Sequence, residues 1–162
     1  MRIAVISDTH IPVNVSELPQ KLLDALKDCD LIIHAGDLID ISVLESLKKI
    51  CKVEAVYGNM DPLKVKSILQ DKKVLNICGK KICLMHGHGH PDKLIDFLKN
   101  EFCKEKPDII IFGHSHMPMN EHIDGILFFN PGSPTDTIYA PHRTYGIIEI
   151  NEDKVEAKIC KL

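Results

Sequence analysis

The sequence predicts a layered α/β sandwich in which two β-sheets pack face to face and helices cover their outer faces. Two observations support this fold class. Over the first two thirds of the chain, short apolar runs alternate with segments whose apolar residues recur at helical spacing, which favours parallel strands with covering helices. The last third instead contains apolar runs separated by turn residues, which predicts antiparallel hairpins.

The β-α units are expected in the first two thirds of the chain. The apolar runs predict buried strands at 2–7, 31–34, 53–57 and 109–112. Helical spacing of apolar residues predicts helices at 18–27, 41–50 and 94–102. The turn Cys78-Gly79-Lys80 separates two further runs, 74–77 and 81–85, and indicates a hairpin.

The last third is expected to form a second, mainly antiparallel sheet. Its predicted strands are 123–129, interrupted at Asp124-Gly125, then 145–150 and 155–160 around the turn 151–153. The two longest irregular pieces, 8–17 and 131–143, are expected to form the rim of a site, because functional residues concentrate in loops held by a rigid scaffold.

The composition limits the class of protein. With 162 residues, 44% of them hydrophobic, and no repeat or linker, we expect one domain spanning 1–162. The net charge is −3 and arginine occurs only at positions 2 and 143, which argues against binding of extended nucleic acid or a membrane surface. Six cysteines without a CxxC pair, and a strand that directly follows Met1, predict a cytoplasmic protein with reduced thiols.

Metal-binding side chains follow five of the apolar runs at the point where each run ends. These residues are Asp8, Asp37, Asn59, His86 and His114, and two more imidazoles, His10 and His116, follow two residues after a member of this set. Because the carboxyl ends of parallel strands meet at one edge of a sheet, we expect the seven to converge. Nitrogen and oxygen ligands without cysteine suit an open site for Mn, Fe, Zn, Co or Ni, and seven are too many for one ion.

Each motif also has an ordinary structural interpretation when it is taken alone. Asp8-Thr9-His10 could be a helix cap and Gly58-Asn59 a turn, so the prediction rests on the ordered set. Asp40, Asp61 and Asp136 could orient imidazoles, but turn or cap acids are the more common explanation. His34 lies within an apolar run, where a hydrogen-bonded core histidine is expected, and Ser133 could donate a hydrogen bond near the site.

The ordered motifs resemble those of the calcineurin-like metallophosphoesterases. They are Asp8-x-His10, Gly36-Asp37, Gly58-Asn59, His86 and Gly113-His114-x-His116, and with the segment Asn130-Pro131-Gly132-Ser133 the chain is most similar to the small YfcE-type phosphodiesterases of bacteria and archaea. The resemblance implies a four-layer αββα sandwich. It also implies one metal on Asp8, His10, Asp37 and His116 and a second on Asp37, Asn59, His86 and His114, with Asp37 bridging the two ions.

The function expected from the resemblance and the ligand set is hydrolysis of small phosphodiesters, with a cyclic nucleotide as one candidate. Two divalent cations, Mn or Ni in preference and Fe, Zn, Co or Mg as alternatives, would share a hydroxide that attacks phosphorus. Asp37 and Asn59 would take part in catalysis as ligands. Many members of the family carry a histidine after the Asn, where this chain has Met60, which cannot transfer a proton. His88 is therefore the candidate general acid.

Two alternatives stay open at this point. The same site could hydrolyse phosphomonoesters, or the chain could be a binding scaffold like the retromer subunit built on this fold, which has lost some of the ligand residues. The scaffold would be expected to expose a sizeable apolar patch. Exposed edges of an antiparallel sheet could also pair between two copies of the chain, so a homo-oligomer is a further possibility.

Overall fold

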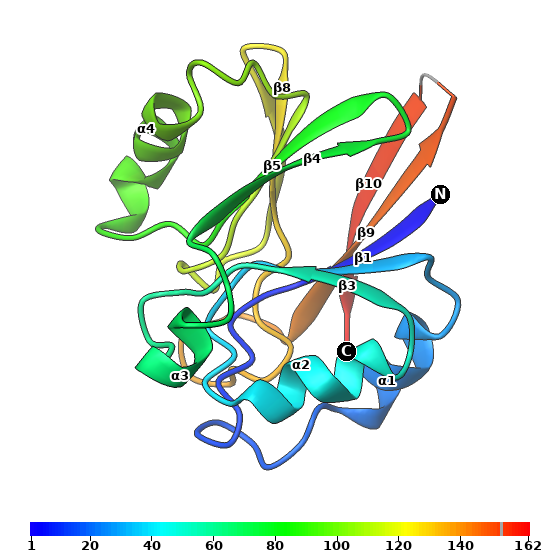
Figure 1. Cartoon of the computed structure of the whole chain (residues 1–162), viewed down its shortest axis with the longest axis vertical. Coiled ribbons are helices and arrows are strands. Elements are labelled where there is room, and N and C mark those ends of the chain that lie inside the picture. Colours follow the sequence, from blue (N-terminus) through cyan, green and yellow to red (C-terminus); the bar gives the residue numbers. More distant parts are fainter. Residues whose placement is uncertain (153) are drawn as a thin grey trace.

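The structure, a computed structural model, describes residues 1–152 and 154–162 and consists of two five-stranded sheets with helices outside them (Figure 1). The strands are β1 (Arg2–Ile6), β2 (Leu31–His34), β3 (Lys52–Ala55), β4 (Lys72–Ile77), β5 (Lys80–Met85), β6 (Ile109–Ile111), β7 (Met119–Ile123), β8 (Ile126–Asn130), β9 (Thr144–Asn151) and β10 (Lys154–Lys161). The helices are α1 (Gln20–Leu26), α2 (Ile41–Lys48), α3 (Leu63–Lys66) and α4 (Pro91–Glu101).

Both sheets are mixed, as predicted. The first sheet has the order β10-β9-β1-β2-β3, in which β1, β2 and β3 are parallel and β9 and β10 are antiparallel to their neighbours. The second has the order β4-β5-β6-β8-β7, in which β5, β6 and β8 are parallel. The predicted hairpin is confirmed as β4 and β5, which pair antiparallel across the turn at residues 78 and 79.

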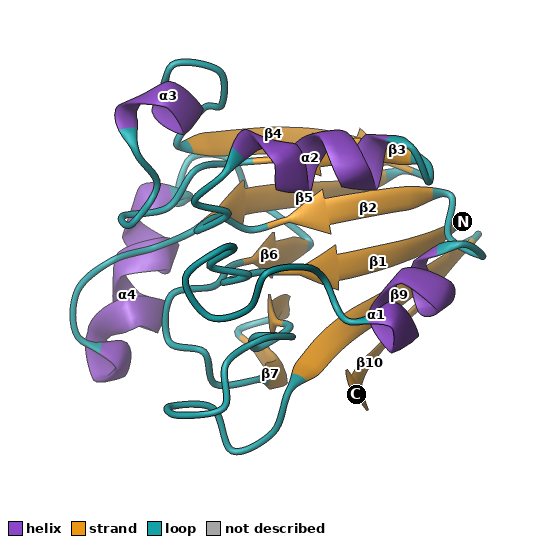
Figure 2. Ribbon diagram, turned by 90° about the horizontal axis from the view of Figure 1, so that it is seen from below, coloured by secondary structure: helices purple, strands orange, loops and turns teal. Residues whose placement is uncertain are grey.

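Alternating side chains of the strands separate the interior into layers. On β1, Ile3 and Val5 face a core shared by the two sheets, whereas Ala4 and Ile6 face a second core beneath α1 and α2. A third core lies between the second sheet and α4, where Phe128 packs with the helix. The layers are therefore helix, sheet, sheet and helix, and the predicted αββα fold class is confirmed (Figures 1 and 2).

The expected separate sheet in the last third of the chain is wrong. Strands β7 and β8 join the second sheet beside β6, and β9 and β10 extend the first sheet beside β1. The local sequence specifies hairpins, but it does not specify which existing strand edge each hairpin extends. The turn predicted between β9 and β10 includes residue 153, which lies outside the described residues.

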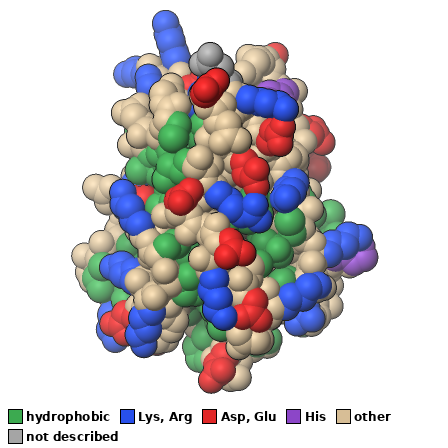
Figure 3. Space-filling model, turned by 90° about the vertical axis from the view of Figure 1, so that its right-hand side faces the viewer, with side chains coloured by type: hydrophobic (Ala, Val, Ile, Leu, Met, Phe, Trp, Pro, Cys, Tyr) green, Lys and Arg blue, Asp and Glu red, His purple; other side chains and the backbone are tan. Residues whose placement is uncertain are grey.

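Smaller differences concern the helices and the surface. Helix α3 was not predicted, because four residues are too few to show a helical period. Helix α4 begins at Pro91, which suits the first turn because proline lacks the N–H that has no partner there. Among the described residues, no helix is long and apolar enough to cross a membrane. Basic and acidic side chains are interspersed on the face that Figure 3 shows.

Candidate metal centre

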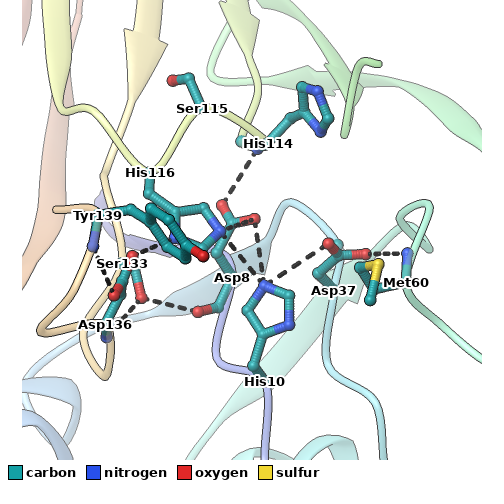
Figure 4. A network of polar contacts seen from close by, with 12 residues as sticks. Asp8, His10, Asp37, Met60, His114, Ser115, His116, Ser133, Asp136 and Tyr139 are labelled. Atoms are coloured by element: carbon teal, nitrogen blue, oxygen red, sulfur yellow. Dashed lines mark hydrogen bonds and ion pairs between the residues drawn. The ribbon is translucent and has the colours of Figure 1, made fainter. Parts of the chain in front are cut away.

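The candidate site lies where loops from both sheets meet. Asp8 and His10 follow β1, Asp37 follows β2, and His116 follows β6. Figure 4 shows these side chains pointing toward one another, although His116 lies more than a hundred residues from Asp8 and His10 in the sequence. The expected convergence of strand ends is therefore observed for these residues, and His86, directly after β5, joins them.

The first group consists of Asp8, His10 and His116, with one ligand atom from each residue within 4.8 Å of the others. Asp8 Oδ1 lies 3.3 Å from His116 Nε2 and 3.8 Å from His10 Nε2. The two Nε2 atoms lie 3.3 Å apart. Two imidazole nitrogens and a carboxylate oxygen that face one common point are a donor set suited to a divalent transition metal.

The second group consists of Asp8, Asp37 and His86. His86 Nε2 lies 3.3 Å from Asp37 Oδ2 and 3.8 Å from Asp8 Oδ1. Asp37 Oδ2 also lies 3.6 Å from His10 Nε2, so one carboxylate oxygen faces an imidazole of each group. Asp37 therefore faces both groups, whereas Asp8 is the residue that belongs to both of them. The bridging role that the family resemblance implies for Asp37 stays a prediction.

The other two predicted ligands form a neighbouring pair. His114 Nδ1 lies 3.0 Å from Asn59 Oδ1, and its Nε2 lies 2.8 Å from the carbonyl oxygen of Gly89. The His114 ring lies edge-on to the His86 ring at a centroid distance of 5.5 Å. His114 is thus close to the second group, but it does not belong to either of the two close-packed groups, and its nitrogens face Asn59 and Gly89.

Two buried atoms test whether these residues fit metal ions. Asp8 Oδ1 and His86 Nε2 are both buried, and neither has a hydrogen-bond partner among the described residues. A buried carboxylate oxygen or imidazole nitrogen without a partner is costly, and a cation shared between the two groups would satisfy both atoms. His86 donates its Nδ1 hydrogen to the carbonyl oxygen of Ala35 at 2.7 Å, so a cation that displaces the proton on Nε2 would meet a lone pair there.

Electrostatics in the cluster are dominated by these close approaches. Burial alone would raise the pKa of Asp8, but the imidazoles of His86, His10 and His116 outweigh it and hold that pKa well below its usual range. Burial alone would lower the pKa of His86, but Asp8 and Asp37 raise it to about 9. Without metal, the carboxylates therefore hold protons on imidazoles that a cation would displace.

The backbone at the site adopts left-handed conformations that non-glycine residues seldom take. Positive φ angles occur at five of the seven predicted ligands: Asp8, His10, Asp37, His114 and His116. Each costs roughly 1 kcal/mol, so surrounding contacts must hold these residues in place. Two such contacts join the loops after β1 and β2, where the N–H groups of Asp8 and His10 donate to the carbonyl oxygens of Gly36 and Asp37, both at 3.0 Å.

Comparison with known proteins decides the family. Residues 1–153 match the model of the calcineurin-like phosphoesterase superfamily domain. The chain belongs to this superfamily. It is 40% identical to a "probable metallophosphoesterase" of Methanocaldococcus jannaschii over 98% of this chain and 80% of that one. A phosphodiesterase of the same organism is 28% identical, over 82% of this chain and 83% of that protein.

A solved structure supports the fold and the metal-binding character of the superfamily. Vps29 of Entamoeba histolytica, determined in complex with zinc, superposes with a TM-score of 0.77 at 26% identity and covers 99% of both chains. The family resemblance predicted from the motifs is confirmed, and so is metal binding as a property of this metallophosphoesterase fold.

Asp61 joins two of the loops that carry predicted metal ligands, a role that the sequence did not indicate. Asp61 is buried, and its carboxylate accepts hydrogen bonds from the backbone N–H groups of Ile39 at 2.7 Å, Gly58 at 2.8 Å and Asp37 at 3.0 Å. It therefore connects the loop that carries Asp37 to the loop that carries Asn59. The more common explanation, an acid that serves only its own turn, is wrong for Asp61.

Asp136 orients an imidazole of the first group. Its Oδ2 accepts the Nδ1 hydrogen of His116 at 2.5 Å, while Oδ1 accepts from the N–H groups of Ile138 and Tyr139. Burial alone would lower the pKa of His116, but Asp8 and Asp136 raise it to about 9. The turn explanation is again incomplete, because the carboxylate fixes which nitrogen of His116 faces Asp8. Asp40, in contrast, is a helix cap, accepting from Ser42 N.

Three further sequence expectations can be compared with the structure. Ser133 donates to the carbonyl oxygen of Asp8 at 2.7 Å, as predicted. His34 is a buried core histidine whose Nδ1 accepts from Gly36 N, and burial lowers its pKa to about 3. His88, the candidate general acid, is exposed and its ring packs against Phe97 at a centroid distance of 4.2 Å.

Proposed function

We propose that the chain is a phosphodiesterase that uses two divalent cations, the first held by Asp8, His10, Asp37 and His116 and the second by Asp37, Asn59, His86 and His114. The observation that carries the proposal is the pair of buried, partnerless atoms, Asp8 Oδ1 and His86 Nε2, beside a carboxylate that faces both imidazole groups. When bound, such cations polarise phosphoryl oxygens and lower the pKa of water. Mn and Ni remain the favoured ions, with Fe, Zn, Co and Mg as alternatives.

The protein's own residues would position the reaction. Asp37 would hold both ions. Met60 N donates to Asp37 Oδ1 at 2.8 Å, which leaves Oδ2 directed at the imidazoles. Asp136 and Ala35 accept the outer hydrogens of His116 and His86, so each ring presents Nε2 to the centre. These contacts orient the ligands before substrate arrives.

We propose His88 as the proton donor to the leaving alcohol. Met60 is exposed and has no proton to give, whereas His88 lines the same cavity as Asn59 and His86. A general acid contributes about 10²- to 10⁴-fold when the leaving group is a poor one. The variant His88→Gln should therefore slow the release of an alkyl alcohol strongly and of 4-nitrophenoxide little; equal effects on both would rule out proton donation.

The experiment that tests the proposed function is hydrolysis of bis(4-nitrophenyl) phosphate and 4-nitrophenyl phosphate. Metal-stripped protein would be assayed alone and after addition of Mn, Ni, Mg or Zn, beside Asp37→Ala and His116→Ala. We expect metal-dependent cleavage of the diester that both variants lose. Faster cleavage of the monoester would favour the phosphomonoesterase alternative, and metal-dependent turnover that survives both substitutions would contradict the proposed site.

A non-catalytic scaffold is the second candidate function. Large apolar side chains are exposed on loops and on α3 near the site, among them Met60, Leu63, Ile138 and Tyr139. An exposed apolar surface is expected of a protein that binds other proteins, and the Vps29 likeness adds to this candidate. Stoichiometric metal binding without turnover of either ester would favour it over the enzyme.

A homo-oligomer formed through the edge strands β10 or β7 would be detected by sedimentation.

A further inference from the structure

A cavity of about 360 Å³ opens beside the second group of the metal centre. Asn59 and His86 lie in its wall, together with residues of α3 and α4, and Figure 1 places these two helices on the same side of the molecule. His10 and His116, which belong to the first group, are not among the residues that line the cavity. Its volume is within the usual range of small-molecule sites, about 300–1,000 Å³. A substrate phosphate at the centre would have this space on the side of the second group.

Aromatic side chains form part of the cavity wall. Tyr57 and Phe97 both line it, and the His88 ring lies against Phe97 at an interplanar angle of 52°. Lys66 Nζ lies 5.7 Å from the centroid of the Tyr57 ring, within the range of a cation–π contact. Aromatic rings in a cavity wall favour a planar ring over an aliphatic chain, because packed rings bury area at low conformational cost.

One cationic side chain and two carboxylates line the cavity. Lys66 Nζ donates to the carbonyl oxygen of Asn59 at 3.1 Å, which fixes a positive charge where the cavity meets the metal centre. Asp71 and Glu101 also line the cavity. Asp71 Oδ1 accepts from the backbone N–H of Lys72 at 2.9 Å, and Glu101 Oε2 accepts from the Lys72 ammonium at 2.9 Å. Within the described part of the chain, Asp71 Oδ2 and Glu101 Oε1 have no hydrogen-bond donor, so both can accept from a ligand.

We propose that this cavity binds one ester arm of the diester, and that this arm is a nucleoside whose base carries an exocyclic amino group. The base would stack on Phe97 and Tyr57, its amino group would donate to Asp71 or Glu101, and Lys66 would lie next to the phosphate. The inference rests on the proposed phosphodiesterase function for its substrate, but the cavity itself is independent of turnover. It names a substrate class, nucleoside phosphodiesters with an amino-bearing base, and a specificity residue, Phe97.

Equilibrium binding tests the cavity without relying on activity. Adenosine 5′-monophosphate, uridine 5′-monophosphate and ribose 5-phosphate would be titrated into metal-free and Mn-loaded protein and followed by ligand-observed NMR. We expect the adenine nucleotide to bind about tenfold more tightly than ribose phosphate, with the uridine nucleotide between them. Phe97→Ala should remove the advantage of the bases over ribose phosphate, and Glu101→Gln should reduce the preference for adenine over uracil.

Tyr139→Ala is the matched control, because Tyr139 is an exposed aromatic residue on the His116 side of the centre and outside the cavity. It should leave all three affinities unchanged. Equal binding of the three ligands, or loss of affinity in Tyr139→Ala but not in Phe97→Ala, would overturn the inference. Glu101→Gln keeps the test valid if Phe97→Ala fails to fold.

A kinetic comparison distinguishes the phosphodiesterase proposal from the cavity assignment. The 4-nitrophenyl esters of methyl phosphate and of adenosine 5′-phosphate would be compared in the Mn-loaded protein. Phe97→Ala should raise KM for the adenosine ester about tenfold relative to the methyl ester, whereas the control Tyr139→Ala should change neither ester. If neither ester is hydrolysed but adenine nucleotides bind through Phe97, the phosphodiesterase proposal fails and the cavity assignment stands. If the methyl ester is hydrolysed and the base gives no advantage, the phosphodiesterase proposal stands and the cavity assignment fails.

Discussion

Replacing Asp61 by Asn should weaken the structure that holds two ligand loops together. Oδ2 of Asp61 accepts from the N–H groups of Asp37 and Gly58, and Oδ1 accepts from Ile39 N. An Asn side chain offers only one oxygen. Its best orientation keeps the two bonds at the Oδ2 position and turns the amide NH2 toward Ile39 N–H, which leaves a donor facing a donor.

The magnitude follows from these contacts. An unsatisfied buried donor costs about 1–3 kcal/mol, and two bonds to a charged acceptor become weaker bonds to a neutral one. Removing the charge recovers part of this loss, because burial raises the pKa of Asp61 and so disfavours its charged form. We therefore expect the free energy of unfolding of the metal-free protein to fall by about 2 kcal/mol.

Urea unfolding of metal-free Asp61→Asn is the assay, with Asp40→Asn as the matched control. Asp40 accepts from Ser42 N at an exposed helix cap, where Asn is about as effective as Asp. The control should therefore change the free energy of unfolding by less than about 0.5 kcal/mol. Metal affinity should also fall in Asp61→Asn. A variant as stable as the control, with unchanged metal affinity, would refute the assigned role of Asp61.

Three other predictions concern the metal centre. The pKa values of His86 and His116 are raised to about 9, so metal must displace their protons; its affinity should rise as the pH is raised toward 9, with proton release detectable by calorimetry in buffers of different ionisation enthalpy. Asp136→Asn replaces the oxygen that accepts from His116, so metal affinity should fall about 10- to 100-fold in equilibrium dialysis, and an unchanged affinity would count against that contact. A Cβ at Gly58 would lie 2.2 Å from Asp37 Oδ1, so Gly58→Ala should displace the carboxylate proposed to hold both ions and lower the metal bound per chain; full metal content would be inconsistent with this close approach.

The sequence predicts those parts of the fold and site that depend on local pattern. Strands alternate with helices along the chain. A ligand that directly follows a parallel strand therefore lies at the sheet edge where the other strand ends meet. That rule brings Asp8, His10, Asp37, His86 and His116 together from the ends of four strands. The αββα layers follow from the same alternation and are confirmed.

The parts that depend on long-range contacts could not be predicted. The carboxylate of Asp61 binds N–H groups as far as 24 residues away, and Asp136 contacts His116, which lies 20 residues earlier in the chain. Both acids look like ordinary turn residues in the local sequence. The pairings of β8 with β6 and of β9 with β1 are likewise long-range contacts, which the sequence of a hairpin does not specify.

The most direct test of a two-ion centre is anomalous diffraction from crystals of the protein grown with Mn²⁺. The proposal predicts two Mn peaks per chain, one among Asp8, His10 and His116 and one between Asp37 and His86, with Asp37 contacting both. Site occupancy would be compared with Asp37→Ala, which should lose both peaks or retain a weak one. A single peak that does not contact Asp37, or no peak at saturating Mn²⁺, would contradict the two-ion assignment.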